Sequence, residues 1–390
     1  MPEPGRRYPR GHGNARGRYD GRFERFRIGT QGATTVIGCT ISGNHAGDGG
    51  AGSVDGGSGG NGGGLYVAGG QATITGSTFS GNAGGTGGDG GSGTAGYGGY
   101  GGGIESNKGT TVIMNSTVTG NHGGEGGAGT PAGNNGNGGG VDNSNDGTLT
   151  LINCTISGNH TGSSRGYGGG ANNFGALTFR HTIIANNTAS SLGPDCIGTT
   201  SLHSDGYNLV ENTDKCPIDS NANNVYGQDP LLGTLGDYGG PTLTFEPQPG
   251  SPVVDAGNPA GCTHHEGGPL TVDQRGFPRH VDGGSGSATC DIGAVELQPR
   301  YLLTVNVRGA GTVTSDWDDV DCGNDCTGWY GDGASVTLTA TPSGDWSTFI
   351  GWGGACSGTG SCVVVMDQAR TVTAAFVADN QVYVPVIRRE

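Results

Sequence analysis

The sequence predicts an all-β protein, in which a short parallel β-helix of about five recognisable coils precedes a small separate β-rich module. Three observations carry this prediction. A six-residue motif that ends in Gly-Asn occurs four times, and a degenerate fifth copy follows. Gly-Gly-Gly-apolar segments precede copies two to five. The last part of the chain alternates apolar and polar residues with period two, which is typical of strands.

The repeated blocks cover residues 62–83, 101–122, 138–160 and 168–187. A block of this length cannot bury its own apolar face, so neighbouring blocks must stack as coils. Stacking places equivalent residues in columns, and two apolar columns are expected to face the interior. The first column comprises Val36, Ile74, Ile113, Leu151 and Thr178, and the second comprises Ile41, Phe79, Val118, Ile156 and Ile183.

The asparagines of the Gly-Asn motif form a third column, for which we predict a structural role. Asparagine tolerates left-handed φ at a turn, and stacked amides can hydrogen-bond from one coil to the next. The column comprises Asn44, Asn82, Asn121, Asn159 and Asn186.

Glycine-rich inserts separate the blocks, at 46–61, 84–100, 123–137 and 161–167. They carry too little apolar area to form a core, so we expect them to be flexible or to pack as extended Gly-rich helices. Their carboxylates suggest a calcium site, but no insert repeats the nonapeptide calcium motif, which argues against it. These carboxylates are Asp48, Asp55, Asp89 and Glu125.

The repeats of residues 29–190 resemble the right-handed parallel β-helix repeats of bacterial surface proteins, including the polymorphic outer-membrane protein type. The resemblance implies a fold and a surface setting more than an activity. Residues 1–28 lie outside the pattern and are rich in arginine, so we expect a disordered basic arm or a mis-assigned start. This stretch has no apolar region of the kind found in a signal peptide. The first block, 29–45, resembles a coil without its first half.

Residues 191–298 change in character. The series includes Asp229-Pro-Leu-Leu-Gly233, Gly239-Gly-Pro-Thr242, Val254-Asp-Ala-Gly257 and Cys290-Asp-Ile-Gly-Ala-Val-Glu296, and it resembles the choice-of-anchor Q domain found at the end of secreted bacterial β-helices. The resemblance implies a sorting or anchoring device without established chemistry. Charged side chains in this segment are expected to form a buried ion-pair network that closes the end of the β-helix. They are Asp255, Asp273, Arg275, Asp291 and Glu296.

Residues 301–377 are predicted to form a separate β module, because four stretches alternate with period two. These stretches are Tyr301-Leu-Leu-Thr-Val-Asn-Val307, Gly311-Thr-Val-Thr314, Ser335-Val-Thr-Leu-Thr-Ala340 and Arg370-Thr-Val-Thr-Ala-Ala-Phe376. The module resembles a divergent internalin-type B-repeat of cell-surface proteins. The tail, 378–390, is far too short to cross a bilayer.

Composition restricts the function. The chain has 390 residues and a net charge of −15, so nucleic acid is a poor partner. No run of residues is apolar and long enough for a transmembrane helix. Ten cysteines in an acidic, Gly-rich chain favour an oxidising, extracellular or cell-surface location, as the resemblances also imply. We expect a monomer.

The cysteines fall into two groups. Cys39 and Cys154 share one column three coils apart, ~14 Å, which is too far for a disulfide, so both are predicted to be buried free thiols. Local pairing of the others predicts four disulfides: Cys196–Cys216, Cys262–Cys290, Cys322–Cys326 and Cys356–Cys362. The last four cysteines could instead hold zinc, but the C-x2-C spacing is absent and the setting is oxidising. A metal site formed by His45, His122 and His160 is a further alternative to solvated turn positions.

The best candidate site lies just after the Gly triplets, where Tyr66, Glu105, Asp142 and Asn172 share one column that we expect to face solvent. Glu105 and Asp142 would lie ~5 Å apart, a spacing that suits a retaining glycosidase pair or a calcium-bridged lyase site. The predicted ligand-binding residues are Tyr66, Glu105, Asn107, Asp142, Asn143 and Asn172, and Lys108, Asn145, Asp146 and Asn173 surround them.

Two functions remain open. The first is a non-catalytic surface or secreted protein, whose β-helix presents Gly-rich loops for adhesion or for binding carbohydrate. It needs no cofactor, although calcium is possible. The second is a polysaccharide lyase or glycoside hydrolase that acts on an acidic polysaccharide through Glu105 and Asp142. The catalytic residue sets of the β-helix lyases and polygalacturonases are absent from the repeats, which favours the first function.

Overall fold

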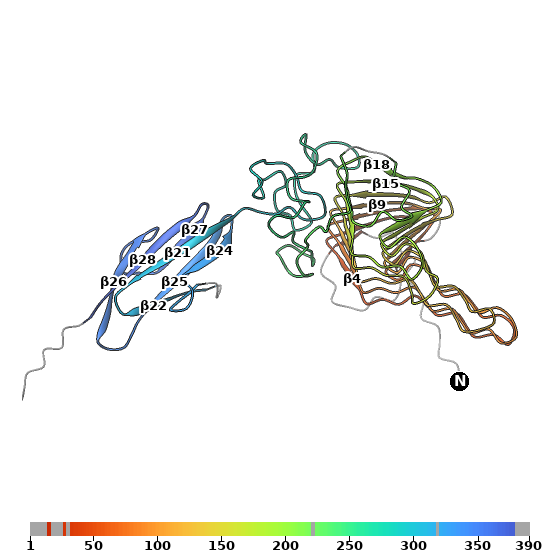
Figure 1. Ribbon diagram of the computed structural model, residues 1–390, viewed down its shortest axis with the longest axis horizontal. Helices are drawn as coiled ribbons and strands as arrows, with labels where there is room; N and C mark the ends of the chain where they lie inside the picture. Colours follow the sequence, from red (N-terminus) through yellow and green to blue (C-terminus); the bar gives the residue numbers. More distant parts are fainter. Residues whose placement is uncertain (1–13, 17–25, 29–31, 220–222, 317–319, 379–390) are drawn as a thin grey trace, which may run out of the picture. The chain divides into compact units, whose positions relative to one another are not determined.

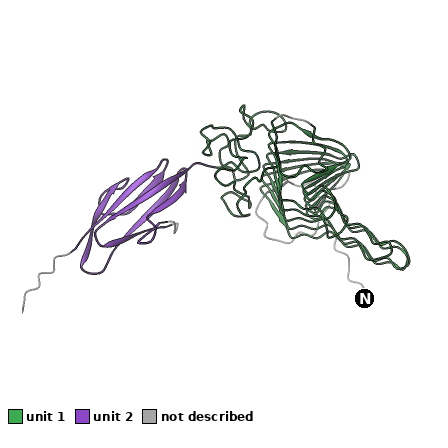
Figure 2. Ribbon diagram, in the orientation of Figure 1, with its two compact units in different colours: residues 1–297 green, residues 298–390 purple. Residues whose placement is uncertain are grey.

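The computed structural model describes residues 14–16, 26–28, 32–219, 223–316 and 320–378. The chain divides into two compact units, residues 1–297 and 298–390 (Figure 2). All regular secondary structure in the described residues is β-strand, and none of these residues lies in a helix that could span a bilayer.

The first unit is a parallel β-helix (Figure 1). Each coil contributes one strand to each of three parallel sheets, and six complete coils are present in the described residues. The first sheet contains β2 (Phe26–Ile28), β5 (Leu65–Ala68), β8 (Ile104–Asn107), β11 (Val141–Ser144), β14 (Ala171–Asn173) and β17 (Cys196–Gly198). The second contains β1 (Asn14–Arg16), β3 (Ala33–Ile37), β6 (Gln71–Thr75), β9 (Thr110–Met114), β12 (Thr148–Ile152), β15 (Ala176–Arg180) and β18 (Leu202–Ser204). The third contains β4 (Thr40–Ser42), β7 (Thr78–Ser80), β10 (Thr117–Thr119), β13 (Thr155–Ser157), β16 (Ile183–Ala185), β19 (Leu209–Val210) and β20 (Val225–Tyr226).

The apolar columns fill the interior as predicted for the first four copies, but the fifth copy is shifted by one residue. Leu151 pairs with Phe179 rather than Thr178, and Ile156 pairs with Ile184 rather than Ile183. Phe179 and Ile184 are fully buried, whereas Thr178 is half-buried. A one-residue shift exchanges the faces of a strand, so the predicted Thr178 and Ile183 point away from the interior.

The β-helix extends beyond the predicted boundaries at both ends. Strands β17 to β20 continue the three sheets past residue 190. Before residue 29, β1 pairs with β3, and β2 pairs with β5. The prediction that 1–28 is a disordered arm is therefore wrong for 14–16 and 26–28, and the rest of that stretch lies outside the described residues. Strand β2 supplies the first-sheet strand that the first coil was expected to lack.

The three long inserts, residues 46–61, 84–100 and 123–137, pack together as one projection that we call the insert lobe (Figure 1). Each insert runs outward in one arm and returns in another, and consecutive arms exchange backbone hydrogen bonds. The N–H of Gly85 donates to the carbonyl of Gly60, and the N–H of Gly99 donates to the carbonyl of Gly85. The prediction of packed, extended Gly-rich arms holds, whereas that of flexible loops does not.

Residues 229–297 lie along the outer side of the third sheet. Gln274 Nε2 donates to Thr78 Oγ1 (2.9 Å), and Thr117 Oγ1 donates to Gln274 Oε1 (2.7 Å). Part of the predicted ion-pair network is buried there: Arg275 pairs with Asp273, and Glu296 pairs with Arg279, which was not predicted. Asp255 and Asp291 accept backbone N–H groups instead. The network does not close the end of the β-helix as predicted, because its segment runs past several coils rather than over the last one.

The second unit is a sandwich of two four-stranded sheets in the order β24-β21-β28-β26 and β23-β22-β25-β27. Its strands are β21 (Arg300–Arg308), β22 (Gly311–Ser315), β23 (Asp321–Cys322), β24 (Thr327–Gly331), β25 (Ala334–Pro342), β26 (Ser347–Gly354), β27 (Cys362–Met366) and β28 (Arg370–Ala378). Leu303, Val336 and Val372 are fully buried between the sheets. The chain contains the four predicted disulfides, and Cys39 and Cys154 are buried free thiols.

Candidate functional site

The predicted column of Tyr66, Glu105, Asp142 and Asn172 exists in the predicted register. Tyr66 pairs with Glu105, Glu105 with Asp142, and Asp142 with Asn172, on strands β5, β8, β11 and β14. The residue before each of them is apolar and fully buried in the coil interior. Because successive strand residues point to opposite faces, the column points out of the coil.

The column does not face solvent, which corrects the prediction. Relative exposure is 0% for Glu105 and 1% for Asp142 and Asn172, although Tyr66 is half-buried. The first glycine of each triplet brings the chain tightly over the column. A Cβ placed on Gly101 would lie 2.8 Å from Glu105 Cβ, and one on Gly138 would lie 2.7 Å from Asp142 Cβ. The returning arms of the inserts thus cover the carboxylates.

Each carboxylate is hydrogen-bonded through one oxygen only. Ser144 Oγ and Asn107 Nδ2 donate to Glu105 Oε1 (2.8 and 3.2 Å), and Asn172 Nδ2 donates to Asp142 Oδ1 (2.6 Å). Glu105 Oε2, Asp142 Oδ2 and Asn172 Oδ1 are buried and accept no hydrogen bond. Leaving a buried acceptor unpaired costs ~1–3 kcal/mol, more when it is charged, so three in one column require an explanation.

Burial also changes the protonation of the pair. Desolvation raises the pKa of Asp142 to about 7, and desolvation followed by the charge of Asp142 raises the pKa of Glu105 to about 8. Burial and the same two carboxylates raise the pKa of Tyr100, which belongs to the second insert.

The other predicted site residues do not join this cluster, apart from Asn107. Asn143 and Asn173 occupy the next position along their strands and bond to each other, Asn143 Nδ2 to Asn173 Oδ1 (2.8 Å). Lys108, Asn145 and Asp146 are exposed turn residues with positive φ. These residues shape the turns between the first and second sheets. Ser144 and Tyr100 were missed. Ser144 lies on β11 two residues after Asp142, so alternation along the strand could have placed it on the same face, whereas only the folded second insert brings Tyr100 to the carboxylates.

In this structure the column lies out of reach of a polysaccharide. A general acid or a nucleophile must come within hydrogen-bonding reach of its substrate, and Glu105 and Asp142 are almost fully buried. Their raised pKa values are those of two acids held in a desolvated space rather than of an accessible catalytic pair.

The carboxylates of the insert lobe bond its coils together. Asp48 accepts the N–H of Thr86 (2.7 Å), Asp55 that of Thr94 (2.8 Å), and Asp89 that of Ala128 (2.8 Å). Glu125 accepts the N–H of Ser163 (2.9 Å). One sequence signal could have predicted that these inserts pack together. Residues 83–92 repeat with a period of three, in which two glycines follow each non-glycine residue. A helix with three residues per turn and no internal hydrogen bonds satisfies its backbone only through neighbours.

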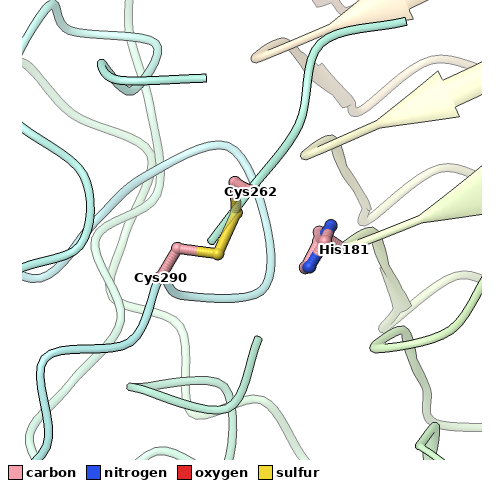
Figure 3. Close-up of side chains that lie close together, drawn as sticks. All are labelled: His181, Cys262 and Cys290. Atoms are coloured by element: carbon pink, nitrogen blue, oxygen red, sulfur yellow. A yellow bond between two sulfur atoms is a disulfide. The ribbon is translucent and has the colours of Figure 1, made fainter. Parts of the chain in front are cut away.

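His181 lies beside the Cys262–Cys290 disulfide, and the ligand atoms of the three residues lie within 4.8 Å of one another (Figure 3). The two sulfurs are bonded to each other, and His181 Nε2 accepts the N–H of Asn258 (3.1 Å). These ligand atoms are therefore already engaged, and we interpret the cluster as structural rather than as a metal site. Burial lowers the pKa of His181 to about 3. Of the other histidines, His122 and His160 stack with ring centroids 5.1 Å apart, whereas His45 pairs with Asp48.

Comparison with known proteins identifies one part of the chain. Residues 301–380 match the family model of the divergent InlB B-repeat domain. The match lies within the second unit and indicates a module typical of bacterial surface proteins. No curated protein and no solved structure matches the chain.

Proposed function

We propose that this protein is a non-catalytic bacterial cell-surface or secreted protein, whose β-helix is a scaffold that holds the insert lobe for binding to carbohydrate or another surface ligand. The observation that carries the proposal is the burial of Glu105 and Asp142 at 0% and 1% exposure. Because of this burial, no substrate can contact the best candidate catalytic pair. The outer face of the insert lobe, in contrast, remains accessible.

The proposed contact surface is the outer side of the returning arms. Hydrogen bonds from Gly59 N–H to Tyr97 and from Gly98 N–H to Asn134 place Ser58, Tyr97 and Asn134 in adjacent arms of consecutive coils. All three side chains are exposed, and Tyr97 is 47% accessible. An exposed aromatic ring flanked by hydroxyl and amide groups suits the apolar face and the hydroxyls of a sugar.

The surface setting rests on the B-repeat match and on the four disulfides, which persist in oxidising compartments. We further propose that residues 191–298 serve as the anchoring segment that their choice-of-anchor Q resemblance implies, and that the chain is a monomer. Fractionation of the native host, with antibody against the second unit, would place the protein on the surface or in the medium. Its recovery only from the cytoplasm would contradict the proposal.

A glycan-array experiment with the full chain tests the binding. We expect Tyr97→Ala to abolish any glycan signal, since the ring is central to the surface. Tyr226→Ala, which removes a tyrosine of similar exposure (41%) elsewhere on the first unit, should retain it. The same glycans are incubated with the wild type and assayed for new reducing ends and unsaturated products. Cleavage that Glu105→Gln abolishes would favour the enzyme instead.

A further inference from the structure

We infer that Glu105, Asp142 and Asn172 form a binding site for a hard divalent cation, with calcium as its occupant, that ties three consecutive coils together beneath the insert lobe. The site goes beyond the proposed function, because it needs no surface ligand and uses residues that such a ligand cannot reach.

The first step is the set of unpaired oxygens. Glu105 Oε2, Asp142 Oδ2 and Asn172 Oδ1 are buried without a hydrogen-bond partner, and all three are acceptors only when the acids are ionised. They come from paired positions of β8, β11 and β14, and Asn172 is tied to Asp142 through its own Nδ2. Ser144 and Asn107 donate to the other oxygen of Glu105, and Asn61, whose amide lies near the same carboxylate, donates no hydrogen bond to Oε2.

The second step is charge. Glu105 and Asp142 oppose each other directly in the register, and among the described residues no lysine or arginine forms an ion pair with either. Two ionised carboxylates cannot share a desolvated space without a counter-charge. A proton shared between them would satisfy one pair of oxygens and would leave Asn172 Oδ1 unpaired. A divalent cation neutralises both acids and gives all three oxygens a partner.

The third step is the choice of ion. The donor set consists of carboxylate and amide oxygens, without a nitrogen or sulfur ligand, which selects a hard cation over zinc or copper. Calcium accepts about six to eight oxygens in irregular geometry, so bidentate carboxylates, Asn172 and water can satisfy it. Magnesium requires a smaller, nearly octahedral shell, which a column of side chains from successive strands is poorly suited to build.

The test uses the full chain, stripped with chelator at pH 8. We expect added calcium to raise the melting temperature by several degrees, and inductively coupled plasma mass spectrometry to find one tightly held calcium per chain after dialysis. Magnesium should give a much smaller shift. Terbium should bind and luminesce on tyrosine excitation, since Tyr100 lies close enough for both carboxylates to raise its pKa.

Three variants make the test specific. Glu105→Gln with Asp142→Asn should abolish the calcium shift and, in chelator, should melt at or above the wild type, because no buried negative charge remains. Asn172→Ala keeps both charges and should weaken calcium affinity about tenfold or more. It serves as the test if the double variant does not fold. Asp146→Asn, which removes an exposed carboxylate of the same coil, is the control and should behave as the wild type.

An unchanged melting temperature between calcium and chelator would overturn the site, as would terbium binding that persists in the double variant. Either result would leave glycan binding at Tyr97 untouched, so the two proposals fail separately.

Discussion

At the residue scale, the asparagine column is the main polar support of the β-helix. Each buried asparagine accepts from the backbone N–H and the amide of its neighbour, as Asn121 Oδ1 does from Asn82 (2.9 Å for both). The column runs from Asn44 through Asn159 to Asn187, not to the predicted Asn186, and ends on the carboxylate of Asp195. Asn186 has φ of 58° and occupies the left-handed turn position that Gly158 fills in the preceding coil.

Substitutions of Asn186 and Asn187 are therefore expected to change the free energy of unfolding by very different amounts. Asn187→Ala should lower the free energy of unfolding by about 3 kcal/mol, because it leaves the buried backbone N–H of Asn159 unpaired and removes the side-chain hydrogen bonds to the carbonyls of Ile156 and Ala185. Asn186→Gly should change it by less than ~0.5 kcal/mol, since glycine adopts left-handed φ freely. Urea unfolding of both variants measures the difference. A larger loss from Asn186→Gly would refute the register of the fifth coil.

Because Glu105 and Asp142 are buried, we expect the stability of the protein to depend on pH when a chelator is present. The pKa values of Asp142 and Glu105, about 7 and about 8, lie above those of unfolded carboxyls, so the native state holds protons that the unfolded state has released. The free energy of unfolding should then fall as pH rises from about 4.5 through about 8, by on the order of 2 kcal/mol or more per carboxyl. Melting curves of the wild type and of the Glu105→Gln, Asp142→Asn variant test this. Equal slopes in both proteins would contradict it.

The two cysteines outside the disulfides are expected to react slowly with alkylating reagents in the native protein. Burial raises the pKa of Cys154 to about 12, and Cys39 is also buried. Since the thiolate is the reactive form, iodoacetamide should label neither residue in the native protein and both after denaturation without reductant. Mass spectrometry of the labelled peptides identifies them. Labelling of any of the other eight cysteines under these conditions would contradict the disulfide pairing.

At the element scale, the insert lobe depends on glycine for close backbone approach. A Cβ on Gly99 would lie 1.9 Å from the carbonyl oxygen of Gly60, and one on Gly136 would lie 1.8 Å from that of Gly99. A side chain at either position would force the arms apart and break the hydrogen bonds that join consecutive inserts. The high glycine content of the inserts is therefore a packing requirement here rather than a sign of flexibility.

Gly99→Ala should lower the free energy of unfolding by about 2–3 kcal/mol and increase amide exchange in residues 84–100. Gly50→Ala is the matched control, because nothing lies within 4 Å of its Cβ position, and it should be neutral to within ~0.5 kcal/mol. Hydrogen-exchange mass spectrometry and thermal melting measure both. Equal effects of the two substitutions would show that the arms are not packed as described.

At the scale of the whole molecule, the chain consists of two units with separate hydrophobic cores, and each holds two of the disulfides. Residues 298–390, expressed alone under oxidising conditions, should fold cooperatively, because their sandwich and both local disulfides lie within the fragment. Circular dichroism and a single melting transition, compared with residues 1–297 alone, measure this. A fragment that orders only when residues 1–297 are attached would contradict the division.

The sequence alone determined the stacking of the coils, the first four positions of each apolar column, the four disulfides and four of the eight strands described in the second unit, β21, β22, β25 and β28. These depend on periodicity and on local spacing, which the chain displays directly. The fifth copy failed because two asparagines follow each other, and only strand pairing shows that Asn186 is in the turn and Asn187 in the column.

Tertiary structure alone decided which side chains meet water. The alternation of side chains along the strands predicts correctly that Glu105 and Asp142 point out of the coil. Insert arms from other parts of the sequence nevertheless fold over them. Burial depends on what packs against a residue, and the arms that cover these carboxylates are rich in glycine. They carry few side chains whose pattern could signal their position, although one of those few, Tyr100, reaches the two carboxylates. The same reason hid the order of the insert lobe, because its stability arises from hydrogen bonds between arms that the sequence separates by a whole coil.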